Sequence, residues 1–126
     1  MLLYPKNTNI KISLGFNVLE VQCPCSSCRS VFINPRLVTA WTKLRNDINF
    51  PVKIHSCYRC QLHNSEVGGA PLSRHQVGEA LDLNLAQLLE KYETPREVYY
   101  KLQECGFTFI QINEQKGYVH CDVRRL

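Results

Sequence analysis

The chain has 126 residues, of which 44% are hydrophobic and 21% are charged, the composition of an ordinary globular protein rather than a disordered one. This length is sufficient for a real core, and we expect a single domain over residues 1–126 that is monomeric. The net charge of +4 is too small to indicate nucleic-acid binding, so no nucleic-acid partner is expected.

The sequence contains neither a membrane span nor a secretory signal. No run of about 18 apolar residues occurs. In the N-terminal segment MLLYPKNTNI, the apolar stretch is interrupted by Pro5, Lys6 and Asn7, unlike the apolar region of a signal peptide. We therefore expect a protein that is made in the cytoplasm without its own export signal.

Seven cysteines, an odd number, argue against a disulfide scaffold in such a chain. Cys23, Cys25 and Cys28 are close enough to form a thiolate cluster, which Cys57-x-x-Cys60 would complete. This arrangement predicts a second, structural zinc ion. The spacing C-x-C-x-x-C is not the usual pair of C-x-x-C motifs, however. The alternative is that these thiols are reduced and partly buried.

The first third of the chain predicts one long helix after an irregular segment. Short strands are expected at residues 11–14 and 16–21, followed by a loop that carries the first cysteines. Asn34-Pro35 is an N-cap followed by proline at the first helical position. One helical face then carries Leu37, Val38, Trp41, Leu44 and Ile48.

The remainder of the chain alternates between strands and helices. We expect a strand at residues 51–56, a long loop at 57–74 and a strand at 79–84. In the last of these, Asp82 lies on one face of the strand and its leucine neighbours lie on the other. Two helices follow, at 86–92 and 95–105, and then a hairpin whose strands are at 107–113 and 118–123. This order predicts an α+β fold, in which helices pack on a small, mainly antiparallel sheet.

In the hairpin, a loop at residues 115–117 would place Glu114 opposite Tyr118. Glu114 would then share one face with His120 and Asp122, about 6–8 Å from the His120 side chain. A carboxylate at that distance from a metal ligand is suited to accept a proton from water at the metal. Glu114 is therefore a candidate general base.

His75, Asp82 and His120 together form the ligand set of an open metal site. Gly78 allows the chain to turn, so that His75 and Asp82 converge. Two imidazoles and one carboxylate leave a fourth position free, the pattern of catalytic zinc. The alternative is that Asp82 caps a turn and that His120 is a hydrogen-bonded core residue.

The segment SRHQVGEALD (residues 73–82), followed by VH (119–120), resembles the zinc D-Ala-D-Ala peptidases of the peptidase M15 group. The upstream CYRC…HN..VGGAP stretch is similar to the carboxypeptidase branch, which occurs in phage endolysins and bacterial cell-wall enzymes. The resemblance covers residues from about 30 to 126. It implies zinc on His75, Asp82 and His120, in a fold like that of D-Ala-D-Ala peptidases and the hedgehog domain.

The resemblance also implies roles for residues around the metal. Arg59 would stabilise an oxyanion or anchor a substrate carboxylate, unless it forms only a loop salt bridge. Ser73 would orient the His75 loop or bind substrate. Tyr118 stands where some relatives have histidine, two residues before the last ligand, and is expected to contact substrate.

The general base departs from the pattern of many relatives, which carry a catalytic glutamate three residues before the last histidine. That position is Gly117 in this chain. Glu114 instead has the spacing of the hedgehog zinc site, where ESKAHIHCSV stands beside EQKGYVHCDV. Asp122 is the competing base, or it holds the second nitrogen of a ligand imidazole.

These features predict a zinc metallopeptidase that hydrolyses peptide bonds in peptidoglycan stem peptides. A D-Ala-type carboxypeptidase and an endopeptidase are equally open. The lack of an export signal suits a phage lysin that acts at the cell wall or periplasm once a separate membrane protein releases it. The alternatives are a non-catalytic zinc-binding module of the same fold and a phage structural or assembly protein.

Overall fold

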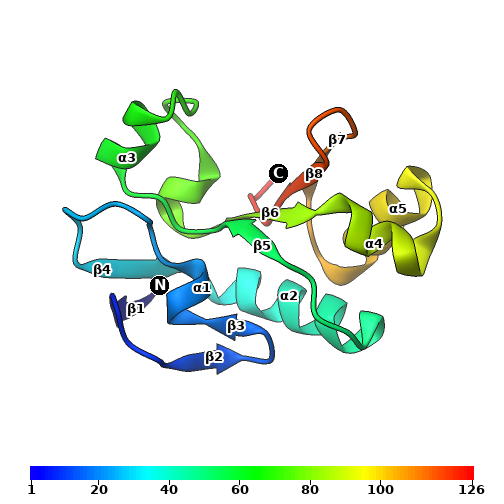
Figure 1. Ribbon diagram of the computed structural model, residues 1–126, viewed down its shortest axis with the longest axis horizontal. Helices are drawn as coiled ribbons and strands as arrows, with labels where there is room; N and C mark the ends of the chain where they lie inside the picture. Colours follow the sequence, from blue (N-terminus) through cyan, green and yellow to red (C-terminus); the bar gives the residue numbers. More distant parts are fainter.

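A four-stranded antiparallel sheet forms the centre of the computed structural model, which describes residues 1–126 (Figure 1). The order of its strands is β5 (Ile54–Ser56), β6 (Ala80–Asn84), β8 (Tyr118–Asp122) and β7 (Phe109–Asn113). Five α-helices and two smaller sheets surround it. The predicted α+β fold with antiparallel pairing is confirmed.

The N-terminal segment is more ordered than its irregular pattern predicts. It forms two small antiparallel sheets, β1 (Leu2–Pro5) with β4 (Ser30–Ile33) and β2 (Lys11–Ser13) with β3 (Phe16–Asn17). The strand expected at 16–21 is wrong beyond Asn17, because helix α1 (Val18–Val21) begins there. The Asn17 side chain caps this helix by accepting from the N–H of Leu19, at 3.0 Å.

The long helices begin where their capping residues predict. In α2 (Pro35–Ile48) the Asn34 side chain accepts from the N–H of Arg36, at 2.9 Å. In α5 (Pro95–Cys105) the Thr94 hydroxyl accepts from the N–H of Glu97, at 3.2 Å. Helix α4 (Leu85–Tyr92) packs beside α5 at one end of the molecule (Figure 1).

The segment expected to be one long loop contains two short helices. These are α3 (Gln61–Glu66) and the 3-10 helix η1 (Arg74–Val77). Helix α3 buries only Asn64, so the sequence carries no apolar stripe that would indicate it. Helix η1 packs against the inner strand β6 and so brings His75 to the face of the central sheet.

One cluster of 26 buried residues forms the core between the sheets and the helices. Trp41 is fully buried in it, as predicted, and its indole N–H donates to the carbonyl of Leu14 at 2.8 Å. Leu81 and Leu83 are also fully buried, whereas Asp82 between them is partly exposed. The alternation of β6 therefore aims Asp82 away from the core.

None of the helices combines the length and the hydropathy that crossing a membrane requires.

The hairpin register differs from the predicted one by a single residue. Asn113 pairs with Tyr118 and Gln111 pairs with His120, so the turn has four residues, 114–117. This register places Ile112 and its neighbour Ile110 on the side of the core. Glu114 consequently lies in the turn rather than on the strand opposite Tyr118, and the predicted pairing is wrong.

Candidate metal centre

His75, Asp82 and His120 converge at the outer face of the central sheet. Strands β6 and β8 pair so that Asp82 lies directly opposite His120. His75 arrives from η1, and its Nε2 lies 3.2 Å from Asp82 Oδ1, which is also 3.1 Å from His120 Nδ1. The three donor atoms all lie within 4.8 Å of one another. The structure thus brings together the three residues that the sequence predicts as metal ligands.

A tight turn delivers His75 to this site. The hydroxyl of Ser73 accepts a hydrogen bond from the N–H of His75, at 3.3 Å, which is the loop-orienting position expected for it. Gly78 ends η1 with φ of 67°, and a Cβ there would lie 2.0 Å from the carbonyl oxygen of Phe32. Only glycine fits this turn, because both the backbone conformation and the space exclude a side chain.

The backbone fixes the orientation of the His75 ring. Its Nδ1 is 2.7 Å from the carbonyl oxygen of Cys57, and a carbonyl can only accept, so Nδ1 carries the proton. The Nε2 lone pair is therefore left to face Asp82. Because His75 is only 2% exposed, this arrangement is held by the surrounding structure.

The carboxylate of Asp122 fixes the orientation of the His120 ring. Its Oδ2 accepts from Nε2 of His120 at 2.8 Å, which leaves Nδ1 of His120 toward Asp82. Arg124 binds both oxygens of Asp122, with Nε at 2.9 Å from Oδ1 and Nη2 at 2.7 Å from Oδ2. Asp122 is fully buried, and both of its carboxylate oxygens accept hydrogen bonds. Of the two roles left open by the sequence, this placement favours holding the ligand over acting as a base.

Charge complementarity keeps the carboxylates of the site ionised. Burial opposes ionisation of Asp122, but hydrogen bonds from His120 and Arg124 outweigh it and lower its pKa to about 2. Burial also opposes ionisation of Asp82, but in the metal-free molecule hydrogen bonds from His120 and His75 hold its pKa well below the usual range. Both groups are therefore anionic at neutral pH.

The distances from Asp82 Oδ1 to the two imidazole nitrogens fit zinc. Ligands at ~2.0–2.1 Å in a tetrahedral zinc site lie about 3.3 Å apart. The two distances to Asp82 Oδ1, 3.2 and 3.1 Å, are close to this value. Two imidazoles and a single carboxylate are also the type of donors that zinc takes when one coordination position stays open.

A cavity of about 340 Å³ adjoins His120, and Glu114 and Tyr118 both line it. Although the register differs from the predicted one, Glu114 therefore still borders the same cavity as the last ligand. The direct neighbour of His120 across the hairpin is Gln111, which the sequence did not indicate because its position depends on the register. The cavity is lined by Gln111, Ile112, Asn113, Glu114, Gln115, Tyr118 and His120.

Arg59 contacts the site through its backbone. Its N–H donates to the carbonyl of His75, at 3.1 Å. Its side chain lines a different cavity, of about 480 Å³, together with His55 and Ser56, and its Nε is buried without a hydrogen-bond partner. Arg59 takes part in none of the ion pairs of the chain, so it does not form the loop salt bridge considered as an alternative.

Comparison with known proteins supports the resemblance seen in the sequence. The family model for peptidase M15 matches residues 14–122, a range that includes His75, Asp82 and His120. No curated protein matches the chain. Because the family model covers far more than half of the sequence, and because three of its residues converge as a metal centre requires, the chain belongs to the peptidase M15 family.

Proposed function

We propose that the protein is a zinc-dependent peptidase. The observation that carries this proposal is the convergence of His75 Nε2, Asp82 Oδ1 and His120 Nδ1. When bound there, zinc would supply Lewis acidity that polarises a peptide carbonyl and makes water nucleophilic near neutral pH. The residues around it would supply orientation and proton transfer.

His75, Asp82 and His120 would hold the ion, and their second contacts would keep them aligned. The carbonyl of Cys57 and the carboxylate of Asp122 each fix one imidazole. Such outer partners raise the basicity of the ligating nitrogen and prevent ring rotation. Since Asp82 is the only anionic member of the ligand set, the site would keep a net positive charge.

Glu114 is the proposed general base. It borders the cavity beside His120 and is exposed, so water and substrate both have access to its carboxylate. The carboxylate would accept a proton from the attacking water and pass it to the leaving amine. Tyr118 borders the same cavity, where its hydroxyl would donate a hydrogen bond to the substrate. Arg59 would anchor a substrate carboxylate from the separate cavity that it lines with His55 and Ser56.

The proposed substrates are the stem peptides of peptidoglycan, cleaved as by a D-Ala-type carboxypeptidase or an endopeptidase. Two features support this class: the M15 family match and a cavity rich in amide side chains, which suit the backbone of a short polar peptide. We further propose that the protein acts as a monomer at the cell wall or periplasm, as a phage lysin would.

Hydrolysis of purified peptidoglycan by the zinc-loaded protein tests this function. Release of new amino groups, lost on chelation and recovered on adding zinc back, is the expected result. If a protein shown to hold zinc at His75, Asp82 and His120 releases no amino groups, the peptidase proposal fails. A non-catalytic zinc-binding module of the same fold would then explain the site, and the position of Glu114 in a turn favours that alternative.

A further inference from the structure

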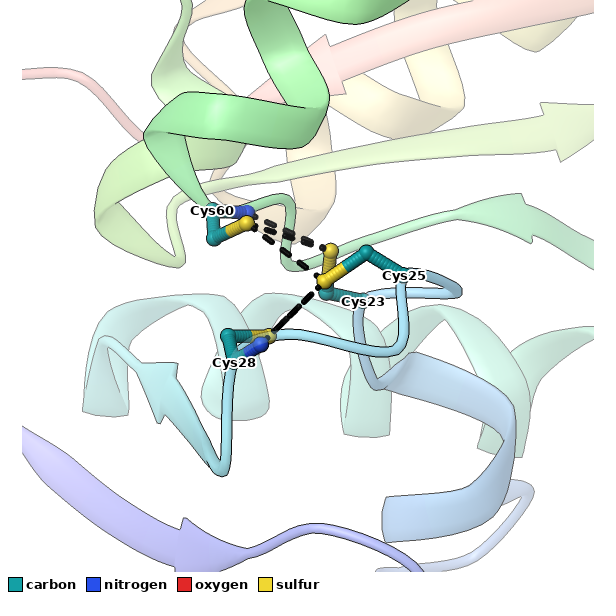
Figure 2. A group of neighbouring side chains, drawn as sticks. All are labelled: Cys23, Cys25, Cys28 and Cys60. Carbon is teal, nitrogen blue, oxygen red and sulfur yellow. Dashed lines mark hydrogen bonds between the residues drawn. The ribbon is translucent and has the colours of Figure 1, made fainter.

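A second cluster of metal-binding side chains lies outside the site described above. Cys23, Cys25 and Cys28, from the loop between α1 and β4, meet Cys60 at the start of α3 (Figure 2). The four sulfur atoms lie within 4.8 Å of one another and point toward a common centre. We infer that these four cysteines bind a structural zinc ion as a tetrathiolate site.

The distances between sulfur atoms fit this ion. Zinc with four thiolate ligands at ~2.3 Å holds their sulfur atoms about 3.8 Å apart. Cys25 lies 3.3 Å from Cys28 and 3.6 Å from Cys60, and Cys60 lies 3.7 Å from Cys23. A set of only sulfur ligands favours zinc over calcium or magnesium, which prefer oxygen.

The groups around the sulfur atoms would stabilise thiolates bound to a metal ion. Three backbone N–H groups donate to them, from Cys28 to Cys25 at 3.4 Å, from Cys60 to Cys23 at 3.4 Å and from His63 to Cys60 at 3.5 Å. Four thiolates around one Zn²⁺ carry a net charge of −2. Donors that point at the sulfur atoms stabilise this excess charge.

Lys6 adds a full positive charge at the same place. Its Nζ lies 3.4 Å from the sulfur of Cys28 and 3.9 Å from that of Cys25, and it also donates to the carbonyl of Cys25 at 2.6 Å. A lysine held among cysteine sulfurs has little to gain if these are neutral. Beside an anionic metal–thiolate cluster it offsets half of the net charge.

The location of the cluster shows what the ion would do for the molecule. Three of its ligands belong to the N-terminal segment, whereas Cys60 directly follows Arg59. The backbone of the same CYRC segment contacts His75 twice, through the carbonyl of Cys57 and the N–H of Arg59. The ion would therefore fasten the N-terminal sheets to the segment that supports the first ligand of the metal centre.

Cys57 is not part of this site, although the C-x-x-C spacing invited its inclusion. It is 2% exposed, and its carbonyl accepts from His75. Cys105 and Cys121 are also buried and lie outside the cluster. The sequence hypothesis of a second zinc is thus sharpened to four named ligands, with Cys60 completing the set.

Zinc content and zinc X-ray absorption of three variants test the site without reading activity. His120→Ala, which disrupts the His/Asp/His centre, is expected to keep one zinc equivalent with sulfur ligands only, at about 2.3 Å. The double variant Cys25→Ser/Cys28→Ser is expected to lose that equivalent and to keep zinc with nitrogen and oxygen ligands. Cys105→Ser, the matched control, should keep both.

Several results would overturn the inference. One is a His120→Ala protein without sulfur-bound zinc, and another is a double variant with the same sulfur-bound zinc as the parent. A disulfide among the four cysteines, or iron in place of zinc, would also do so. If the double variant does not fold, a mercurial thiol reagent is added to the parent protein, and it should release one zinc equivalent. Failure of the peptidase proposal alone leaves these sulfur-ligand results unchanged.

Discussion

Each imidazole of the metal centre uses one nitrogen to face Asp82 and the other to fix its own orientation. His75 is held by a backbone carbonyl, and His120 by the buried carboxylate of Asp122. The second arrangement is the more vulnerable to mutation, because it depends on a side chain. A third residue takes part in this arrangement, because Arg124 donates to both carboxylate oxygens of Asp122.

Asp122→Asn tests this outer contact. The amide keeps the shape of the carboxylate but loses its charge, so His120 is held less firmly and becomes less basic. We expect zinc affinity to fall about 10–100-fold, as for other outer partners of metal ligands. Chelator competition measures this change. Asp47→Asn, far from the site in α2, is the control, and an unchanged affinity in Asp122→Asn would contradict the assigned role.

Glu114→Gln tests the proposed base at the same scale. Because Glu114 borders the cavity but is not a ligand, the variant should bind zinc as tightly as the parent. Its kcat for stem-peptide hydrolysis should fall about 10²–10⁴-fold, which is the contribution of a positioned base. Glu90→Gln, exposed on α4, should keep full activity. Full activity in Glu114→Gln would remove Glu114 from the mechanism.

Among single residues, the sequence predicts one set of metal ligands but two competing bases, Glu114 and Asp122. Residue types alone left open whether His75, Asp82 and His120 bind a metal, and the resemblance to the peptidase M15 group identified them, independently of the length of the hairpin loop. The surroundings of Glu114 depend on the length of the hairpin loop, and a change of one residue moves Gln111 rather than Ile112 opposite His120. The polar closing residue Asn113 allows the longer turn, since its side chain accepts from the N–H of Lys116 at 2.9 Å.

At the scale of elements, the turn at Gly78 decides whether η1 reaches the sheet. Gly78→Ala combines the strain of a positive φ, about 1–3 kcal/mol, with a clash against the carbonyl of Phe32. Gly68→Ala is a matched control, because Gly68 has a similar φ of 71° but open space around it. Chemical denaturation should show a larger loss of unfolding free energy for Gly78→Ala. Equal losses would mean that the close approach to Phe32 is unimportant.

The cysteine cluster connects two segments that are far apart in the sequence, and its loss should make both segments less stable. In the Cys25→Ser/Cys28→Ser variant we expect faster amide hydrogen exchange at residues 20–30 and 57–62, because the link between them is removed. Strands β7 and β8 contribute no ligand to the cluster, so their exchange should stay close to that of the parent. Mass spectrometry of peptic fragments measures both regions, and uniform exchange across the chain would contradict a local linking role.

Elements with strong local signals were predicted correctly, whereas β1, β4 and α3 were not. Helices α2 and α5 carry caps and apolar stripes in their own sequences. Strands β1 and β4 pair across more than twenty residues, and α3 has a polar sequence whose N–H at His63 is capped by a cysteine sulfur. Neither feature produces a periodic pattern that a short window of sequence can show.

At the scale of the whole molecule, the CYRC segment (residues 57–60) links the cysteine cluster to the His/Asp/His centre. Cys60 belongs to one, and the Cys57 carbonyl supports the other. The sequence predicted the His/Asp/His set from its resemblance to the peptidase M15 group and the cysteine cluster from residue spacing. It did not show that β6 and β8 pair with Asp82 opposite His120. Two helices and strand β7 separate these strands in the sequence, so their pairing is fixed by tertiary packing.

Anomalous diffraction at the zinc absorption edge, from crystals of the zinc-loaded protein, tests the central claim most directly. That claim is that His75, Asp82 and His120 bind one zinc ion. We predict an anomalous peak about 2.0–2.1 Å from His75 Nε2, Asp82 Oδ1 and His120 Nδ1. The absence of a peak among these three atoms, in a protein that contains zinc elsewhere, would contradict the account.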